Sequence, residues 1–306
     1  MQRLPLVLVT GSLLLIGGTS SALADIRVGG FNVSRGGGMS IQSGDYLSGL
    51  RTGLAGLGIG PLVYSSTDSL SSTYLGSVDV FVVSSVRDTS TPIQALSEYE
   101  MLVLLDFVQH GGGLIVIADN TDFGGHSVAS ANGSLLDSFG LGITGHLFGV
   151  GTPTLVHPVT SGVASFQILD GGFFDILPAS CQVLARIGTG DPVLVTIPHN
   201  AMGSGSGAVV AVSDASFVFN ESVNAEAIRL IGNAITYAAP LPSSTCYANC
   251  DGSTASPVLT ANDFFCFLYK FSQGDGYTNC DGSTVAPVLT ANDFQCFLNA
   301  FAQGCP

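Results

Sequence analysis

Residues 97–119 read SEYEMLVLLDFVQHGGGLIVIAD, and this stretch decides the fold. Ser97 and Glu100 form a capping box, which predicts the start of a helix. The apolar residues behind them recur at the spacing of one helical face: Met101, Leu104, Leu105 and Val108. Gly111 ends the helix, and residues 114–118 then form a wholly apolar run that predicts a buried strand.

The same alternation of strand and helix extends over residues 25–239. Further apolar runs predict strands at residues 26–31, 78–83, 193–197 and 208–212. A last helix is predicted at residues 225–238, where Ile228, Ile231 and Ile235 share one face. Because the strands are almost continuously apolar, we expect an α/β domain with a mostly parallel, flavodoxin-like sheet and flanking helices.

The N-terminus predicts export. Arg3 precedes the apolar run of residues 4–18, and Ala22-Leu23-Ala24 is a small-x-small cleavage pattern. The run is shorter than the roughly twenty residues that span a bilayer. We therefore expect residues 1–24 to be a cleaved signal peptide, the mature chain to have no membrane span, and the protein to be secreted or displayed at the cell surface.

The charge balance argues against one class of partner. The chain has 22 acidic and 8 basic residues, a net charge of −14, and Lys270 is its single lysine. Binding to nucleic acid depends on clustered lysine and arginine, which this chain lacks. We expect no nucleic-acid partner.

Residues 240–244 are expected to be a linker, because the composition changes abruptly after them. Six of the seven cysteines follow in residues 245–306: Cys246, Cys250, Cys266, Cys280, Cys296 and Cys305. In an exported chain such a cluster predicts disulfides; a zinc site is the competing interpretation, but there is no CxxC and no histidine after His199. Six cysteines allow fifteen pairings. Symmetry favours Cys250 with Cys266 and Cys280 with Cys296, which leaves Cys246 and Cys305 to join the ends.

The symmetry comes from a repeat with a period of 30 residues, in which residues 249–254 recur as 279–284 and residues 257–264 as 287–294. Each copy first places side-chain oxygens where they can converge on one ion: Asn249, Asp251, Ser253 and Asp263, then Asn279, Asp281, Ser283 and Asp293. Calcium takes such oxygen ligands. In the alternative interpretation, the same side chains only cap turns and helices. Each copy then has a short helix with an aromatic face, formed by Phe264, Phe267, Leu268 and Phe271 and by Phe294, Phe297, Leu298 and Phe301. The two faces are expected to pack together.

Residues 245–306 resemble a dockerin, a duplicated, EF-hand-related calcium module, in the cysteine-containing variant that ends in Gly-Cys, here Gly304-Cys305. The resemblance implies a cohesin-like or other extracellular protein partner. Two departures matter: asparagine stands at loop position one where aspartate is usual, and Thr254 and Thr284 replace the turn glycine. Fewer carboxylates and a longer loop predict weak calcium binding, roughly 10⁻⁴ to 10⁻³ M.

The larger domain resembles glutamine-amidotransferase-like and ThuA-like domains of flavodoxin type. The resemblance is carried by residues 107–116, 132–140, 157–163 and 208–220, which are mainly packing and turn motifs. An amidotransferase needs a cysteine on a strained elbow beside a histidine. Cys181 is the one cysteine here and lacks the flanking glycines, so amidotransferase chemistry is not expected.

Other candidates lie in the loop after residue 118. Asp119, Asp122 and His126 could bind a metal or other ligand at the carboxyl edge of the sheet, where α/β domains bind ligands; the alternative is a polar loop of caps. Ser127, in Gly125-His126-Ser127-Val128-Ala129, only partly matches a serine-hydrolase elbow.

No catalytic residue is assigned. We expect an exported, non-catalytic α/β binding or interaction domain that the C-terminal module attaches to an extracellular or cell-surface partner. The alternatives are a secreted hydrolase acting on carbohydrate or ester and carrying the same anchor, and a tail that is only a structural cap. A cleft that gathers Asp119, Asp122, His126 and Asp214 would favour the hydrolase.

Overall fold

The computed structural model describes residues 25–89, 91–188, 190–203, 205–240, 247–253, 257–281, 283 and 286–304, without the side chains of Phe123 and Gln303. The predicted signal peptide, residues 241–244 of the predicted linker, Cys246 and Cys305 lie outside these residues. The described residues form two separate hydrophobic cores, one within residues 28–238 and one within residues 248–297.

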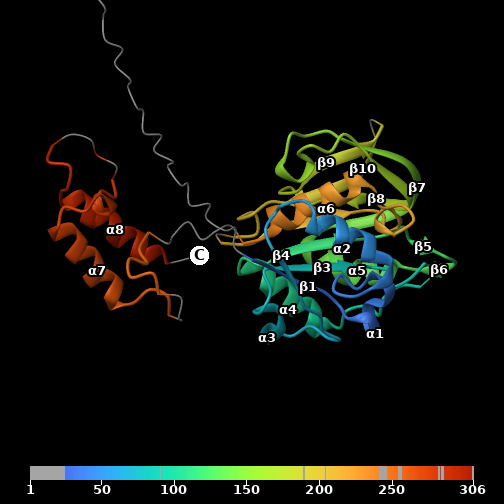
Figure 1. Cartoon of the computed structure of the whole chain (residues 1–306), viewed down its shortest axis with the longest axis horizontal. Coiled ribbons are helices and arrows are strands. Elements are labelled where there is room, and N and C mark those ends of the chain that lie inside the picture. The colour runs from blue at the N-terminus through green and yellow to red at the C-terminus, as the bar shows by residue number, and fades with distance from the viewer. Residues whose placement is uncertain are drawn as a thin grey trace, which may run out of the picture.

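A nine-stranded sheet lies at the centre of the larger part (Figure 1), in the order β2-β1-β3-β4-β11-β10-β9-β7-β8. Its parallel half comprises β1 (Ile26–Gly29), β2 (Leu62–Tyr64), β3 (Val80–Ser84), β4 (Gly113–Ile117) and β11 (Val209–Val212). Every residue of β3, β4 and β11 is buried, as their continuous apolar sequences predict. The order of these five strands is that of flavodoxin-like sheets.

The other half of the sheet is antiparallel, formed by β7 (Gly142–Pro153), β8 (Phe166–Ile176), β9 (Gln182–Ile187) and β10 (Asp191–Ile197). The sheet is therefore mixed, and the expectation of a mostly parallel sheet is wrong. The physical reason is connection length. Residues 188–190 join β9 to β10, far too few for the helical crossover that a parallel neighbour requires.

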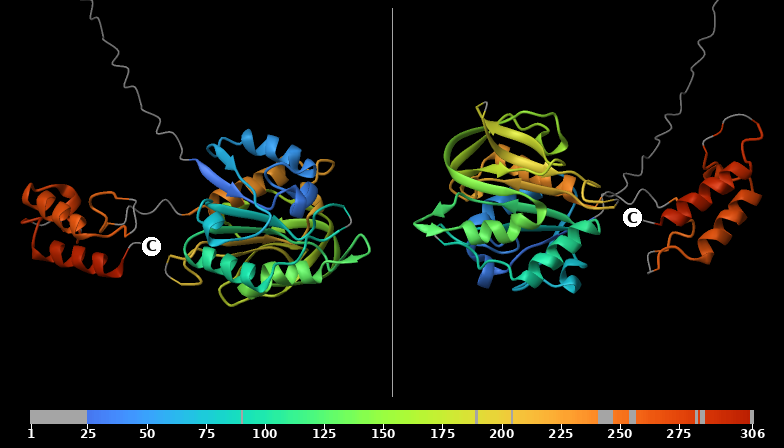
Figure 2. Two further views of the ribbon diagram at one scale, coloured as in Figure 1. Left: turned by 90° about the horizontal axis from the view of Figure 1, so that it is seen from below. Right: turned by 180° about the vertical axis from the view of Figure 1, so that it is seen from behind.

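Helices cover both faces of the sheet. Figure 2 shows α2 (Ser48–Ala55) and α6 (Ala225–Ala238) on one face, and α3 (Ser72–Leu75), α4 (Glu98–Gln109) and α5 (Ala129–Leu136) on the other. The helix α1 (Val33–Gly36) follows β1. The capping box of Ser97 and Glu100 starts α4, and α6 has the predicted bounds. Gly113 lets α6 approach β4, because a Cβ atom there would lie 2.1 Å from the carbonyl oxygen of Ala238.

Smaller elements complete the chain. Two short strands, β5 (Asp122–Phe123) and β6 (His126–Ser127), form a separate hairpin. The described 3-10 helices are η1 (Gly37–Met39), η2 (Asp45–Leu47), η3 (Asp137–Phe139), η4 (Pro158–Thr160), η5 (Ser216–Val218) and η6 (Gly276–Thr278). None of the described helices is long and apolar enough to cross a membrane.

The repeat forms two helices that lie side by side (Figure 1), α7 (Ala261–Ser272) and α8 (Ala291–Gln303). Phe267 stacks on its counterpart Phe297 with ring centroids 4.1 Å apart, and both are fully buried. Tyr247 stacks on Tyr277, and each hydroxyl donates a hydrogen bond to the carbonyl oxygen of the other residue. Leu268 does not join this core and is 39% exposed, and its counterpart Leu298 is not part of the core either. The six phenylalanines of the expected face do belong to it.

Candidate functional site

Each copy of the repeat folds its oxygen-bearing loop back onto the start of the following helix. A disulfide joins Cys250 to Cys266 with Cα atoms 5.7 Å apart, and another joins Cys280 to Cys296 with Cα atoms 5.8 Å apart. These are the two pairs that the repeat symmetry favours. They bring the early loop residues, near Asp251, beside the late carboxylate of Asp263.

Asp263 is the third residue of α7 and is fully buried. Its Oδ2 accepts a hydrogen bond from the backbone N–H of Thr260 at 2.8 Å, and its Oδ1 accepts one from Asp251 at 3.1 Å. The second copy repeats this arrangement at Asp293, with distances of 2.7 and 3.2 Å. The capping role that the alternative interpretation gives these aspartates is therefore real, and it fixes both carboxylates inside the loops.

The asparagines at the first loop position leave an oxygen without a partner. Asn249 Nδ2 donates to the carbonyl oxygen of Ser253 at 2.8 Å, while the buried Oδ1 of Asn249 accepts no hydrogen bond from any described residue. Asn279 repeats this pattern, with Nδ2 donating to Ser283 at 2.9 Å. Flipping either amide would place its oxygen against a carbonyl oxygen, so the orientation is set by the donor. A buried acceptor with no donor is costly, and a cation would satisfy it.

The carboxyl groups of each loop lie close together. The carboxyl groups of Asp251 and Asp263 are within hydrogen-bonding reach, and the backbone N–H of Ser253 lowers the pKa of Asp251. Burial raises the pKa of Asp293, but hydrogen bonds from the Thr290 and Asp281 backbones outweigh it, and the net shift is downward. No basic side chain in the described part of the chain pairs with these carboxylates. The donor set of amide, carboxylate and hydroxyl oxygens fits calcium.

A second cluster of carboxylates lies in the larger domain, where β4 and β11 end. Asp119 and Asp214 are both fully buried. Burial, and then the charge of Asp214, raises the pKa of Asp119 to about 9; burial raises the pKa of Asp214 to about 6. Both side chains accept backbone hydrogen bonds: Asp119 from Asn120 and Ala215, and Asp214 from Leu169 and Ser216. They therefore fasten the ends of β4 and β11 to β8.

Further contacts complete this hydrogen-bonded cluster at the strand ends, which we call the clamp. Gly172 donates its N–H to the carbonyl oxygen of Ser213 at 2.8 Å, and Asn120 Nδ2 donates to the carbonyl oxygen of Asp170 at 2.7 Å. The Nε2 atom of His146 on β7 is hydrogen-bonded to the carboxylate of Asp170. No sequence pattern indicates Asp170 and His146, because Asp170 lies 50 residues from Asn120 and 24 residues from His146. The cluster has the geometry of a structural fastening between the two halves of the sheet.

The three candidate ligands after β4 are not arranged as one site. Asp119 is sealed in the interior, whereas Asp122 and His126 are exposed on the β5-β6 hairpin. Among the described residues, no three histidine, cysteine, aspartate or glutamate side chains are placed to hold a metal ion. Ser127 is also exposed, and within the described chain no histidine hydrogen-bonds to it.

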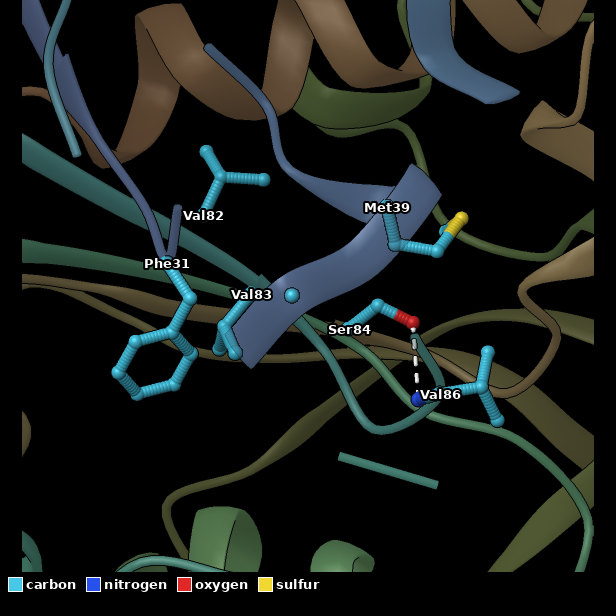
Figure 3. A pocket seen from close by; sticks show the side chains of 7 residues that line it. Phe31, Met39, Val82, Val83, Ser84 and Val86 are labelled. Carbon is cyan, nitrogen blue, oxygen red and sulfur yellow. Dashed lines mark hydrogen bonds between the residues drawn. The ribbon is translucent and has the colours of Figure 1, made fainter. Parts of the chain in front are cut away.

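A pocket at the carboxyl ends of β1 and β3 is nearly filled by its own walls (Figure 3). Apolar side chains, among them Phe31, Met39 and Val86, surround a cavity of about 10 Å³. That volume holds about one water molecule. Ser84, the hydroxyl in its lining, accepts the backbone N–H of Val86. This pocket is too small for a substrate.

Cys181 lacks the surroundings of a nucleophile. It is a free thiol of intermediate exposure, and burial raises its pKa to about 11. Reactive cysteines have lowered pKa values because the thiolate is the attacking species. The position of Cys181 thus differs from an amidotransferase nucleophile in its electrostatics as well as in its sequence.

No family model and no curated protein matches the chain. Among solved structures it is similar to the N-terminal domain of mmIFT52, with a TM-score of 0.50 and 12% identity over 69% of this chain and 95% of that chain. A putative ThuA-like protein from Bacteroides uniformis has a TM-score of 0.42 and 14% identity, over 69% and 89% of the chains. A glutamine amidotransferase has a TM-score of 0.41 and 17% identity, over 69% and 98%. At these identities the likeness concerns the α/β fold alone.

Proposed function

We propose that this chain is an exported, non-catalytic α/β binding or interaction domain that a C-terminal, dockerin-like calcium module attaches to an extracellular or cell-surface protein. The observation that carries the proposal is the same in both copies of the repeat. Among the described residues, a buried asparagine oxygen accepts no hydrogen bond in a loop that also holds two neighbouring carboxyl groups without a basic partner. One ion per loop would satisfy all of these groups.

The ligands in each loop would be the asparagine Oδ1, both carboxylates and the serine hydroxyl. In the first copy these belong to Asn249, Asp251, Ser253 and Asp263, and in the second to Asn279, Asp281, Ser283 and Asp293. The hydroxyl of Ser253 donates to the carbonyl oxygen of Val258 at 3.0 Å, so its lone pairs are free to face an ion. A bound ion would neutralise the carboxylates and order the loop that presents the module to its partner.

The non-catalytic part of the proposal is supported by the buried state of the strand-end acids. Asp119 and Asp214 are fully buried, so neither can reach a substrate in this arrangement. Asp122 and His126 are exposed on the hairpin and share no buried cleft with them. The alternative, a secreted hydrolase, has no comparable support.

The test of the calcium module is a pair of substitutions, Asp251→Asn and Asp281→Asn, in the full-length oxidised chain. An asparagine keeps the acceptor for the Ser253 N–H and can turn an amide donor toward Asp263, so it removes a charged ligand without removing the turn contact. Without calcium, each variant should be at least as stable as the wild type. In titration calorimetry, each should lose one of the two calcium sites.

Asp106→Asn is the matched control, because Asp106 is a surface carboxylate with a 65% exposed side chain on α4. This variant should bind calcium at both sites with the affinity of the wild type. If the wild type takes up no calcium up to about 10 mM, an order of magnitude above the range of weak extracellular modules, the calcium module is refuted.

The attachment is tested by capture from the native extracellular protein fraction, with the intact wild-type chain and the double variant Asp251→Asn/Asp281→Asn as baits. A docking module should retain a defined partner in calcium that the double variant and calcium-free buffer release. If both baits capture the same proteins in equal amounts, the calcium loops do not mediate docking, and the tail is a structural cap.

A further inference from the structure

We infer that the disulfides Cys250 to Cys266 and Cys280 to Cys296 are positioning elements for the two cation loops: each holds the two halves of a ligand set together before an ion binds. This inference rests on the proposed calcium site and adds a role for residues that are not ligands. It also predicts that calcium affinity depends on the redox state of the tail.

The cysteines occupy the right places in the chain for this role. Cys250 stands between two of the proposed ligands, Asn249 and Asp251. Cys266 follows the last of the four, Asp263, by about one turn of α7. With Cα atoms only 5.7 Å apart, the bond therefore couples the early half of the ligand set to the late half. Cys280 and Cys296 do the same in the second copy.

Few other forces hold the two halves together. One such contact is the hydrogen bond that the Asp251 N–H donates to the Asp263 carboxylate at 3.1 Å. No salt bridge crosses the loop among the described residues. The disulfide is the one covalent link across the described part of the loop, and Cys250 is itself largely buried against the aromatic core.

Without the bond, the ion would have to close the loop itself. The two cysteines are 16 residues apart, and closing a loop of that length costs on the order of 100-fold in an equilibrium constant. The Phe267 stack and the capping box of Thr260 keep α7 in place and reduce this cost. We expect loss of one disulfide to weaken calcium binding at its own loop by about 10- to 100-fold.

The near-identical copies provide an internal control. Calorimetric titration of calcium into the full-length wild type should give two equivalent sites. The variant Cys250→Ala/Cys266→Ala should keep one site at the wild-type affinity and weaken the other 10- to 100-fold, and Cys181→Ala should change neither. Two unchanged sites in the double variant would overturn the positioning role and leave the calcium proposal intact. No binding to the wild type would instead refute the calcium proposal itself.

If the double variant loses the near-ultraviolet circular dichroism of the stacked aromatic rings, its tail has not folded, and a second measurement on the wild type decides. The chain is equilibrated with mixtures of reduced and oxidised glutathione, with saturating calcium or with chelator. Each disulfide takes two electrons and two protons from two reduced glutathione molecules, giving two thiols and one glutathione disulfide. The Cys250 and Cys280 peptides are then assayed by alkylation and mass spectrometry.

Linkage requires that an ion bound more tightly by the oxidised tail should stabilise the disulfide by the same factor. The midpoint is the value of [reduced glutathione]²/[oxidised glutathione] at which half of a given disulfide is reduced. Calcium should therefore raise this midpoint by 10- to 100-fold for each loop disulfide. A midpoint that calcium does not move, in a chain that calorimetry shows to bind calcium, would overturn the inference.

Discussion

The buried acids Asp119 and Asp214 predict an unusual dependence of stability on pH. Burial raises the pKa of Asp119 from 3.8 to about 9, so between these values the folded domain holds a proton that the unfolded chain has released. Its free energy of unfolding must then fall as pH rises, by about 1.4 kcal/mol per pH unit for one proton. Asp214, with a pKa raised from 3.8 to about 6, adds to the fall at the acid end of this window.

The full shift of Asp119 corresponds to about 7 kcal/mol as an upper limit, and relaxation and water penetration should reduce this to about 3 or 4 kcal/mol. That is a large share of the roughly 5–15 kcal/mol that stabilises a typical domain. Glu100 acts in the opposite direction, because hydrogen bonds from Arg35 and from the Ser97 and Leu70 backbones outweigh its burial and lower its pKa to about 2. Its stabilising effect is lost only as the pH falls below 4.5, outside the range tested.

The assay is urea unfolding of the full-length chain at pH 5, 7 and 9, followed by circular dichroism. Hydrogen exchange of the peptide containing Leu169 isolates the clamp. The wild type should lose stability steadily from pH 5 to pH 9. Asp119→Asn should flatten the profile, with a fixed cost of about 1–2 kcal/mol for the lost acceptor. A wild-type stability that is constant or rises with pH, or a variant that follows the wild-type slope, would refute the reasoning.

Three further predictions concern other parts of the chain. Phe267→Ala should destabilise the tail by about 3–5 kcal/mol in thermal unfolding, because it empties a fully buried stack, whereas Phe265→Ala, at a 65% exposed position, should cost less than about 0.5 kcal/mol; equal effects would contradict the tail core. Glu100→Gln should cost about 3–5 kcal/mol in urea unfolding, because it leaves the buried guanidinium of Arg35 without its anionic partner; a change below about 1 kcal/mol would contradict this. N-terminal sequencing of exported protein should begin at Asp25, and an earlier start would contradict signal cleavage.

The sequence predicted those elements whose cause is local. The capping box at Ser97 and Glu100 needs only four consecutive residues, and the helix starts where it indicates. The wholly apolar strands could be predicted because a strand that is buried on both faces has apolar residues at every position, without alternating polar ones. Glu100 also pairs with Arg35 and accepts the N–H of Leu70, and those partners, 65 and 30 residues away, left no mark in the pattern.

Within the antiparallel half of the sheet, β10 was predicted at residues 193–197, but β7, β8 and β9 were not, and β7 shows a physical reason. β7 reads GITGHLFGVGTP, in which glycines interrupt every apolar run, and glycine has low strand propensity. In its second half, exposed positions alternate with more buried ones. One of the exposed side chains is Phe148, which is 65% exposed. Such a strand is held by its neighbours rather than by its own burial, so only the tertiary structure specifies it.

The tail was predicted in more detail because each position of the repeat occurs twice in the sequence, and the two copies can be compared. Phe267 and Phe297 correspond in the repeat and stack on each other, and the paired cysteines follow the same symmetry. What the repeat left open was whether Asp263 is a cap or a ligand.

The two roles of Asp263 are compatible, and its geometry explains why the position needs a carboxylate. An ionised carboxylate can accept about four hydrogen bonds or ligand contacts, and the cap uses one on each oxygen, from Thr260 and from Asp251. The remaining lone pairs can face an ion. An asparagine would have a single oxygen for two backbone donors and would lose part of the cap. Asp251 also caps a turn, because its Oδ1 accepts the N–H of Ser253 at 2.8 Å. Capping therefore accounts for both aspartates but not for the buried oxygen of Asn249, which accepts no hydrogen bond among the described residues; the proposed cation would contact all three groups.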